Sequence, residues 1–412
     1  MSPSTAVPAN PGTQPVVPTT TPPEHPVALN RKVLLPLVGG NFMVGVGTFV
    51  IASMLPVLAQ DLGTSIAAVG QLLAGYAVAL AIGAPLIAAL TSRIDRRILL
   101  TTAIALFGAL HLLAALMPGY AALFAVRVLT GFVAAVVTPQ AASTAALLAP
   151  PHMRAQALGF VFIGFSVATV MGVPFGGYLA AAVGWRITLA VVGAMSLAVA
   201  LWVWLLIPPG LRIAPMDRAA WTRLARHPAL LLVVTVTVVH ASSQFVLYSY
   251  LVPILQVQAG LAPALSGALF GVLGAFGVAG NLWATRMAGR IEPARIVQGS
   301  LWMMLVAFLL WPAVAWSGGN WWVLFGVCII WGLPVFACNS SQQARLVGLA
   351  PDLASASIAL NSSGIFMGQA IGAAIGGWVI THQGYGALNW WAAAIMVAAI
   401  AVSLRAARAT AR

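Results

Sequence analysis

Twelve long apolar stretches follow one another along the chain, and they constrain its fold more than any other feature. A helix needs about 20 apolar residues to cross the hydrocarbon core of a bilayer. Because that core offers the backbone no water to bond with, segments of this length cross it as helices. We therefore predict an all-α membrane protein with twelve transmembrane helices, within residues 33–58, 68–90, 98–117, 121–148, 157–182, 187–207, 229–257, 265–288, 294–316, 321–344, 355–380 and 387–404.

The scarcity of charge excludes a soluble protein. Only 6% of the 412 residues are charged, against roughly 25% in an ordinary soluble domain. A soluble enzyme, a disordered chain and a disulfide scaffold are therefore excluded. The net charge of +13 lies in short arginine clusters between apolar stretches, which is typical of membrane loops rather than of nucleic-acid binding. We expect the lipid bilayer, and no nucleic acid, as a partner.

Basic residues predict the orientation, because they are enriched in cytoplasmic loops. With the N-terminus in the cytoplasm, all but Arg127 and Arg186 of the 19 lysine and arginine residues fall on the cytoplasmic side. Arg186 follows an outer loop, and Arg127 lies inside a predicted helix. Both termini are therefore expected in the cytoplasm.

Composition along the chain predicts its division into domains. Residues 1–30 are rich in proline and threonine and lack the regions of a signal peptide, so we expect a disordered cytoplasmic tail. The polar interval 208–228 is the longest between apolar stretches, and we assign it to a cytoplasmic linker. It separates two six-helix bundles, at 31–207 and 229–404. Residues 405–412 form a second cytoplasmic tail.

The two bundles carry an internal repeat. One fixed shift lays residues 70, 83 and 93–95 (Gly, Gly and Arg-Ile-Asp) on residues 267, 280 and 290–292 (Gly, Gly and Arg-Ile-Glu). A similar shift lays five glycines of the fifth stretch on five of the eleventh. Such repeats predict two pseudo-symmetric bundles related by an axis along the membrane normal, with a site between them at the midplane. A rocking carrier is built on this duplication, whereas a channel does not need it.

The loop after the second stretch resembles the G-x-L-x-D-R-x-G-R-R pattern of the major facilitator superfamily. Arg93, Arg96 and Arg97 match the pattern, Ser92 replaces its aspartate, and Asp95 replaces its second glycine. The resemblance implies a gating role for the three arginines and for Asp95, since the family's aspartate helps to latch the two halves together. The alternative is a purely positive-inside anchor.

The fifth stretch is similar to the antiporter motif of the drug-exporting branches, which ends in G-P-x-x-G-G. Gly172, Pro174, Gly176 and Gly177 carry the resemblance, and Val173 is an insertion. Small residues on one face let helices approach closely, and the proline predicts a bend. Exchange of substrate against protons is implied by the resemblance alone.

The first stretch narrows the resemblance to one branch. Residues 42–52, followed by Leu55-Pro56 and by 61–63, look like exporters of the arabinose, purine-ribonucleoside and chloramphenicol types. The similarity covers nearly all of 31–404 and implies the major facilitator fold, efflux, multidrug resistance and a bacterial cytoplasmic (inner) membrane. The branch has a membrane glutamate where this chain has Thr48. No acidic residue falls inside a predicted helix, so the usual proton-carrying carboxylate is absent.

Two ionisable residues are candidates for proton coupling. Arg127 begins a sequence similar to the family's R-x-x-x-G element; a cation inside a membrane is functional by default, although a side chain that snorkels to the surface is the alternative. His240 lies near the midplane, and an unperturbed imidazole pKa of about 6.5 suits proton uptake and release. A neutral histidine bonded to a neighbouring helix is its alternative.

Substrate contacts are predicted from polar stripes on helix faces. His240 shares a face with Gln244 and Tyr248, and a comparable stripe lies on the first helix. Other polar residues of the tenth and eleventh stretches, including Gln342 and Asn361, are also candidates. Most of them sit near the cytoplasmic ends of the helices and are explained by solvation, while Gln369 lies deeper. The predicted substrate-binding residues are Asn41, Thr48, Arg127, His240, Gln244, Tyr248 and Gln369.

The remaining candidates receive simpler interpretations. His111 is expected on a lipid-side helix. Trp283, Trp331 and Phe336 are candidates to stack on an aromatic substrate. Cys328 and Cys338 have no partner ligands, so we expect both to pack in the core.

The expected function is secondary active efflux of a small organic molecule, a drug, sugar or metabolite, by alternating access in exchange for protons. The alternatives are a proton-independent facilitator of the same substrates and a membrane receptor or scaffold that transports nothing. The chain has no phosphate-binding P-loop and no metal-ligand cluster, so we expect no ATP hydrolysis, no cofactor and no enzymatic activity. We expect a monomer, and an uncharged or anionic substrate because no membrane acid offers a counter-charge.

Overall fold

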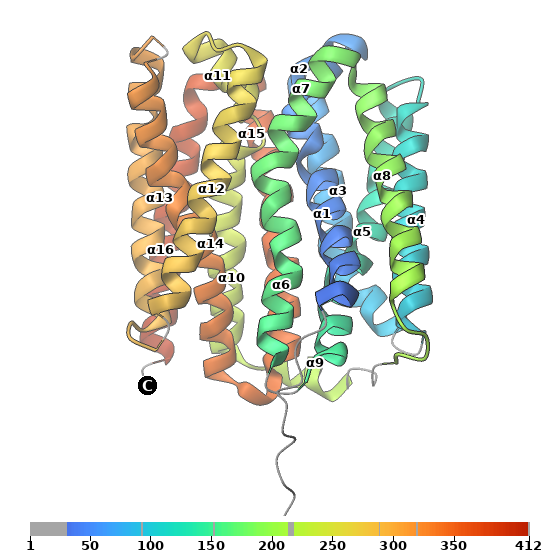
Figure 1. Ribbon diagram of the computed structural model, residues 1–412. Helices are drawn as coiled ribbons and strands as arrows, with labels where there is room; N and C mark the ends of the chain where they lie inside the picture. Colours follow the sequence, from blue (N-terminus) through green and yellow to red (C-terminus); the bar gives the residue numbers. More distant parts are fainter. Residues whose placement is uncertain are drawn as a thin grey trace, which may run out of the picture.

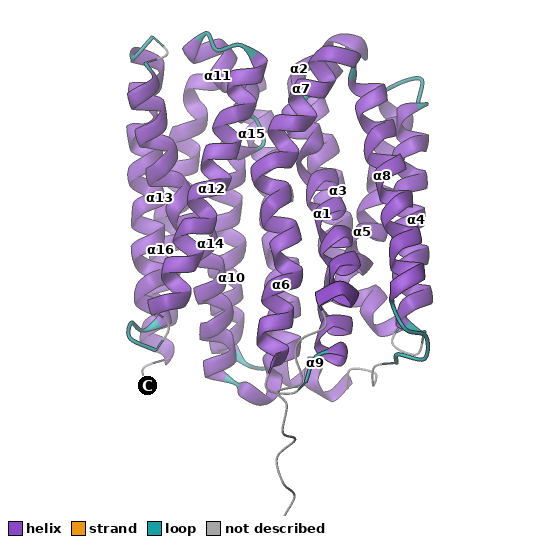
Figure 2. Ribbon diagram, viewed as in Figure 1, coloured by secondary structure: helices purple, strands orange, loops and turns teal. Residues whose placement is uncertain are grey.

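The computed structural model describes residues 31–91, 94–150, 153–212, 218–287, 289–318 and 320–410. These residues form helices joined by short loops, and no strand occurs among them (Figure 2). The predicted tail 1–30, the gating candidate Arg93 and residues 213–217 of the predicted linker lie outside the described residues.

The helices follow the predicted stretches closely. The first set is α1 (Arg31–Ser53), α2 (Leu55–Asp61), α3 (Ile66–Leu90), α4 (Arg96–Ala115), α5 (Tyr120–Leu148), α6 (Arg154–Val167), α7 (Val173–Val183) and α8 (Trp185–Leu206). The short helix α9 (Arg218–Ala225) precedes the second set. That set is α10 (Pro228–Tyr248), α11 (Leu251–Ala259), α12 (Pro263–Met287), α13 (Pro293–Trp316), α14 (Trp321–Leu349), α15 (Ala354–Gln383) and α16 (Leu388–Thr410).

The number of membrane spans agrees with the prediction. Eleven helices of the described chain are long and apolar enough to cross a membrane, and the bent pair formed by α6 and α7 raises the number to as many as twelve. We refer to the helices before α9 as the first half and to those after it as the second half. The all-helical, two-bundle fold class predicted from the sequence is therefore confirmed.

Prolines account for the breaks inside three spans. Between α6 and α7 the chain passes through a π-helical turn, Ala168–Gly172, just before Pro174. A proline has no backbone N–H and its ring clashes with the carbonyl four residues earlier, so the regular helix is interrupted there. Pro56 and Pro253 follow the α1/α2 and α10/α11 breaks in the same way. The predicted bend at Pro174 is present.

The two ends of the bundle differ. The helices α2, α7 and α11 lie at one end, which we call the α11 side, and α9 lies at the other, the α9 side (Figure 1). On the α9 side, Arg223 of α9 forms a 3.2 Å ion pair with Asp352, in the single turn Pro351–Leu353 before α15. The chain between the halves is thus attached to the second half.

The halves meet along two seams. In one, α3 packs against α15; in the other, α12 packs against α7 and the π-helical turn. Figure 1 shows α12 beside α7 on the α11 side and diverging from α6 towards the α9 side.

Candidate functional site

Glycines let the halves touch at the seam between α3 and α15. Tyr250, in the turn between α10 and α11, donates a hydrogen bond of 2.8 Å to the carbonyl of Ala373 on α15. Its ring crosses the seam and lies against Gly70 of α3, where an added Cβ would overlap the ring and its hydroxyl. A Cβ at Gly377 would lie 2.7 Å from the same hydroxyl and 2.9 Å from Nε2 of Gln71. Larger residues would hold this seam apart.

The second seam uses the repeat-related glycines of α12. A Cβ at Gly267 would lie 3.3 Å from the Cα atom of Pro174, and a Cβ at Gly271 would lie 3.0 Å from the carbonyl of Val170. Gly70 and Gly267 are equivalent in the repeat, so each half presents the same glycine to the other. Pro174, predicted as a motif residue, therefore lies directly at the contact between the halves.

The other motif glycines have a different place. Gly172, Gly176 and Gly177 face α1 of their own half, where added Cβ atoms would meet Val46, Val50 and Ser53. Gly364 and Gly372 of α15 face α10 in the same manner; a Cβ at Gly372 would overlap the carbonyl of Ser242. The repeated glycines thus allow the same close helix contact in both halves.

An aromatic cluster joins the halves on the α11 side of the centre. The ring of Phe49 on α1 lies 5.7 Å from that of Tyr248 on α10, in an edge-to-face arrangement. Tyr248 also contacts the rings of Phe270, at 4.9 Å, and Trp331, at 6.1 Å. Tyr248, predicted to contact substrate, is 8% exposed and sits at the junction of both halves.

Arg127 is held in the interior of the first half. It is 1% exposed, and its Nη2 atom donates a 3.0 Å hydrogen bond to the carbonyl of Gly47. Its guanidinium carbon lies 4.3 Å from the ring centroid of Tyr76, within cation–π range. Among the described residues its Nε and Nη1 atoms find no hydrogen-bond partner. The side chain does not snorkel to the membrane surface, so that alternative is wrong.

Tyr76 connects Arg127 to Thr48, which were predicted separately. Its hydroxyl lies 3.2 Å from Oγ1 of Thr48, which in turn donates to the carbonyl of Val44. The sequence interpretation missed Tyr76, although a lone tyrosine within an apolar stretch was an available signal.

His111 lies on the buried face of α4. It is 1% exposed, its Nδ1 atom lies 2.9 Å from the carbonyl of Phe107, and a Cβ on Gly47 would come within 3.0 Å of its Nε2 atom. It therefore faces α1 at the glycine whose carbonyl binds Arg127. This burial is compatible with the expected lipid-side helix, because a peripheral helix still buries one face.

His240 occupies the interior of the second half. Its Nε2 atom is 4.0 Å from Sγ of Cys338 on α14, and its Nδ1 atom is buried with no partner in the described structure. No hydrogen bond or ring contact between described residues joins it to Arg127. The two candidates for proton coupling therefore belong to separate halves.

A polar network in the second half corrects another prediction. Thr237 donates a 2.6 Å hydrogen bond to Asn361, and Gln342 donates to Thr237 and to the carbonyl of Val233. Asn361 and Gln342 are fully buried. They were expected at solvated helix ends, but their side chains instead bond α10, α14 and α15 together.

The remaining predicted contacts are buried. Asn41 donates a 3.2 Å hydrogen bond to the carbonyl of Val161 on α6, while its Oδ1 atom has no partner among the described residues. Gln244 is 5% exposed and Gln369 is 2% exposed. Asn41 thus joins α1 to α6 within the first half.

The three residues predicted to stack on an aromatic substrate do not lie together. Trp331 is completely buried and contacts the rings of Phe308 and Trp311 within the second half. Trp283 is 51% exposed and lies half a turn around α12 from Gly274, which faces the first half. Trp283 therefore points away from the seam, and Phe336 packs against Gly277 of the same helix.

Every acidic residue in the described chain lies at a helix end. Asp61 is the last residue of α2 and pairs with Arg186 at 3.5 Å, while Glu292 precedes α13. Asp95 caps α4 and accepts a hydrogen bond from the backbone N–H of Gly210. The described contacts of Asp95 are thus with its own half and with the loop after α8, not with the second half.

The two described arginines of the gating pattern also bind within the first half. Arg96 donates a 2.5 Å hydrogen bond from Nη1 to Gln140 of α5. Arg97 lies over the ring of Trp204 on α8, with 4.1 Å between its guanidinium carbon and the ring centroid. In this conformation the pattern ties α4 to its neighbours.

A family model for the Major Facilitator Superfamily matches residues 37–362. The chain belongs to this superfamily. Among curated proteins, the superfamily member is 29% identical over 351 residues to the inner membrane transport protein YdhP of Escherichia coli strain K12, covering 84% of this chain and 88% of the relative. It is 27% identical to a probable sugar efflux transporter of Helicobacter pylori strain G27, covering 87% and 91%.

Solved structures share the superfamily fold. A bacterial homologue of the human lysosomal transporter Spinster, in an inward-facing and unoccupied conformation, aligns with a TM-score of 0.70 at 18% identity, covering 93% of this chain and 96% of that one. A D-xylose–proton symporter aligns with a TM-score of 0.70 at 16% identity, covering 91% and 97%. The superfamily member is thus a multi-pass inner-membrane transporter of small molecules.

Proposed function

We propose that this protein exports a small organic molecule by alternating access, in exchange for protons. The observation that carries the proposal is the pair of glycine-lined seams, at which repeat-related residues of each half close the α11 side. At Gly70 and Gly267 the missing Cβ lets residues of the other half, Tyr250 and Pro174, come into direct contact.

Under this proposal the substrate binds between the halves, near the polar groups of both. Arg127 and His240 carry the proton coupling, since each keeps a buried nitrogen with no partner in the described structure. Such groups are costly in a membrane and mark sites where a substrate, water or proton completes the bonding. The predicted substrate contacts are Asn41, Thr48, Gln244, Tyr248 and Gln369. A cationic Arg127 with no acidic neighbour in the described part of the chain favours an uncharged or anionic substrate.

The test begins with a resistance panel of sugars, nucleosides and amphenicol-like drugs. A deletion strain is compared with an overexpressing strain to identify an exported compound. Everted vesicles containing a pH-sensitive dye then receive that compound. We expect substrate-dependent proton release, and we expect a His240→Asn variant to keep expression while losing the pH dependence of exchange. Full pH-dependent exchange in that variant would remove His240 from the mechanism.

A proton-independent facilitator is the second candidate. It is favoured by the position of every described acid at a helix end and by Thr48, which stands where the branch has a glutamate. The same vesicles separate the two candidates. Transport that continues at an unchanged rate after the proton gradient is collapsed supports the facilitator and contradicts antiport.

A further inference from the structure

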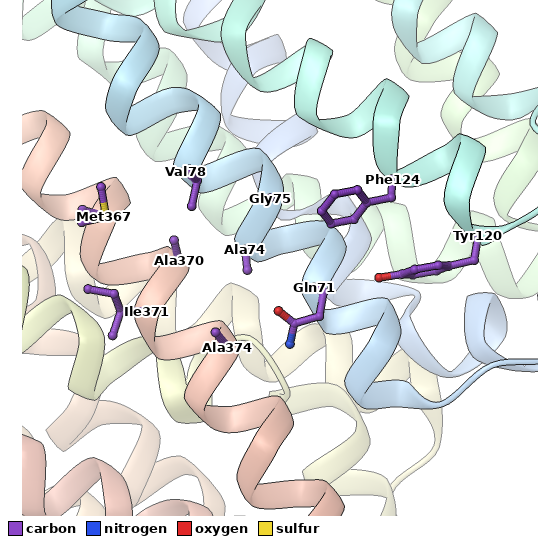
Figure 3. Close-up of a pocket in the computed structure, with 10 residues that line it drawn as sticks. All are labelled: Gln71, Ala74, Gly75, Val78, Tyr120, Phe124, Met367, Ala370, Ile371 and Ala374. Atoms are coloured by element: carbon purple, nitrogen blue, oxygen red, sulfur yellow. The ribbon is translucent and has the colours of Figure 1, made fainter.

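An apolar groove runs along the outside of the seam between α3 and α15. Its deeper part has a volume of about 610 Å³. Figure 3 shows its lining, with Ala74 and Val78 from α3, Phe124 from α5, and Met367, Ala370 and Ile371 from α15. Val78 is 38% exposed and Ile371 is 39% exposed, so the groove opens away from the protein interior. In a bilayer this surface faces lipid.

A second hollow, of about 290 Å³, continues the groove towards the α11 side. The two hollows share Gln71 and Ala374. The second is polar, because Ser65, Thr381 and His382 line it. Ser65 Oγ accepts the backbone N–H of Ala68 at 3.1 Å, which leaves its hydroxyl hydrogen for another acceptor. The groove is therefore polar at its mouth and apolar at depth.

The length of the groove matches one leaflet. From Ser65 to Val78, α3 rises about 20 Å at ~1.5 Å per residue. Half of the hydrocarbon core of a bilayer is about 15 Å, and the headgroup region lies beyond it. A groove of this length accommodates one acyl chain with its headgroup at the mouth.

We infer that the groove binds an acyl chain of a phospholipid from the α11-side leaflet, with the phosphate at Ser65. Small residues at the base of the groove leave space that no side chain of the protein fills. The site crosses the seam, where Gly377 packs against Gln71 while the α11 side is closed. A lipid bound to both halves in this conformation stabilises it, because a ligand favours the state that it binds more tightly.

The test uses photoactivatable lipid rather than transport. The full-length protein is reconstituted in phosphatidylethanolamine–phosphatidylglycerol vesicles with a trace of phospholipid that carries a diazirine on its acyl chain. After illumination, labelled peptides are located by mass spectrometry. We expect label at residues 71–78 and 367–374 above that at other exposed helix faces.

Ala374→Phe is the decisive variant, because Ala374 is exposed and lines both hollows. We expect it to lower labelling of the groove by about tenfold, since each methylene displaced from an apolar site weakens binding several-fold. Ala394→Phe on α16, also at an exposed alanine, is the matched control and keeps wild-type labelling. An unchanged melting temperature in detergent verifies that both variants fold.

Two results would overturn the inference. One is equal labelling of the groove in wild type and Ala374→Phe. The other is displacement of the label by a water-soluble exported compound, which would make the groove a substrate site. Labelling is measured without transport, so its failure is distinct from failure of the proposed export.

Discussion

At the scale of single residues, burial without full hydrogen bonding marks the candidate site. Arg127 is 1% exposed, and its bonds to Gly47 and the Tyr76 ring leave two of its nitrogens without partners among described residues. A lysine at this position has one compact charge and cannot both stack and bond. Arg127 therefore depends on its planar guanidinium as well as its charge.

We predict that Arg127→Lys reduces export at least about tenfold, whereas Tyr76→Phe costs only about 0.5–1.5 kcal/mol of stability, as expected for one hydrogen bond. Tyr76→Phe keeps the ring below the guanidinium and loses only the contact with Thr48. Export from cells and melting temperature in detergent measure the two effects. Wild-type export by Arg127→Lys would show that charge alone is sufficient.

Close glycine contacts lead to a second prediction at this scale. Gly70→Ala places a Cβ against Tyr250 across the seam, and overpacking of this kind costs about 1–3 kcal/mol. Under the proposed mechanism this contact forms only when the α11 side is closed, so we expect export to fall while the protein remains folded. Gly159→Ala is the control, because an added Cβ there meets nothing within 4 Å. Partial recovery of export in Gly70→Ala/Tyr250→Ala would establish the steric origin.

At the scale of helices, the π-helical turn before Pro174 shapes the second seam. It places Val170 against α12, where a Cβ at Gly274 would lie 3.1 Å from the Cα atom of Val170. The two residues therefore touch across the seam, which brings cysteines at these positions within reach of each other.

We predict that Val170→Cys/Gly274→Cys, with Cys328 and Cys338 replaced by alanine, forms a disulfide on mild oxidation and stops export. Export stops because the disulfide holds the α11 side closed, and reduction of the disulfide restores export. Mobility of the protein on a denaturing gel after cleavage between the halves reports the cross-link, and each single-cysteine variant is a control. Undiminished export by the fully cross-linked protein would contradict the rocking of this seam.

At the scale of the whole molecule, the ion pair between the chain that joins the halves and the second half is exposed and weak. The side chains of Arg223 and Asp352 are 58% and 64% exposed, and exposed ion pairs contribute about 0–1 kcal/mol. We predict that Asp352→Asn leaves the melting temperature and the export rate nearly unchanged. A large loss of export with normal stability would instead assign this pair a role in rocking.

The helices and their repeat follow from the sequence alone. Length, hydropathy and the paired glycines predicted twelve spans in two bundles. A membrane permits little else, because each crossing requires a long apolar helix. Tertiary packing decided three other features: the burial of Arg127 within the first half, the contact of His111 with α1, and the network of Asn361 and Gln342. Which face of a helix is covered depends on neighbours distant in the chain, and a uniformly apolar helix carries no periodicity that reveals it. For the same reason the phospholipid groove became visible only when α3 and α15 were brought together.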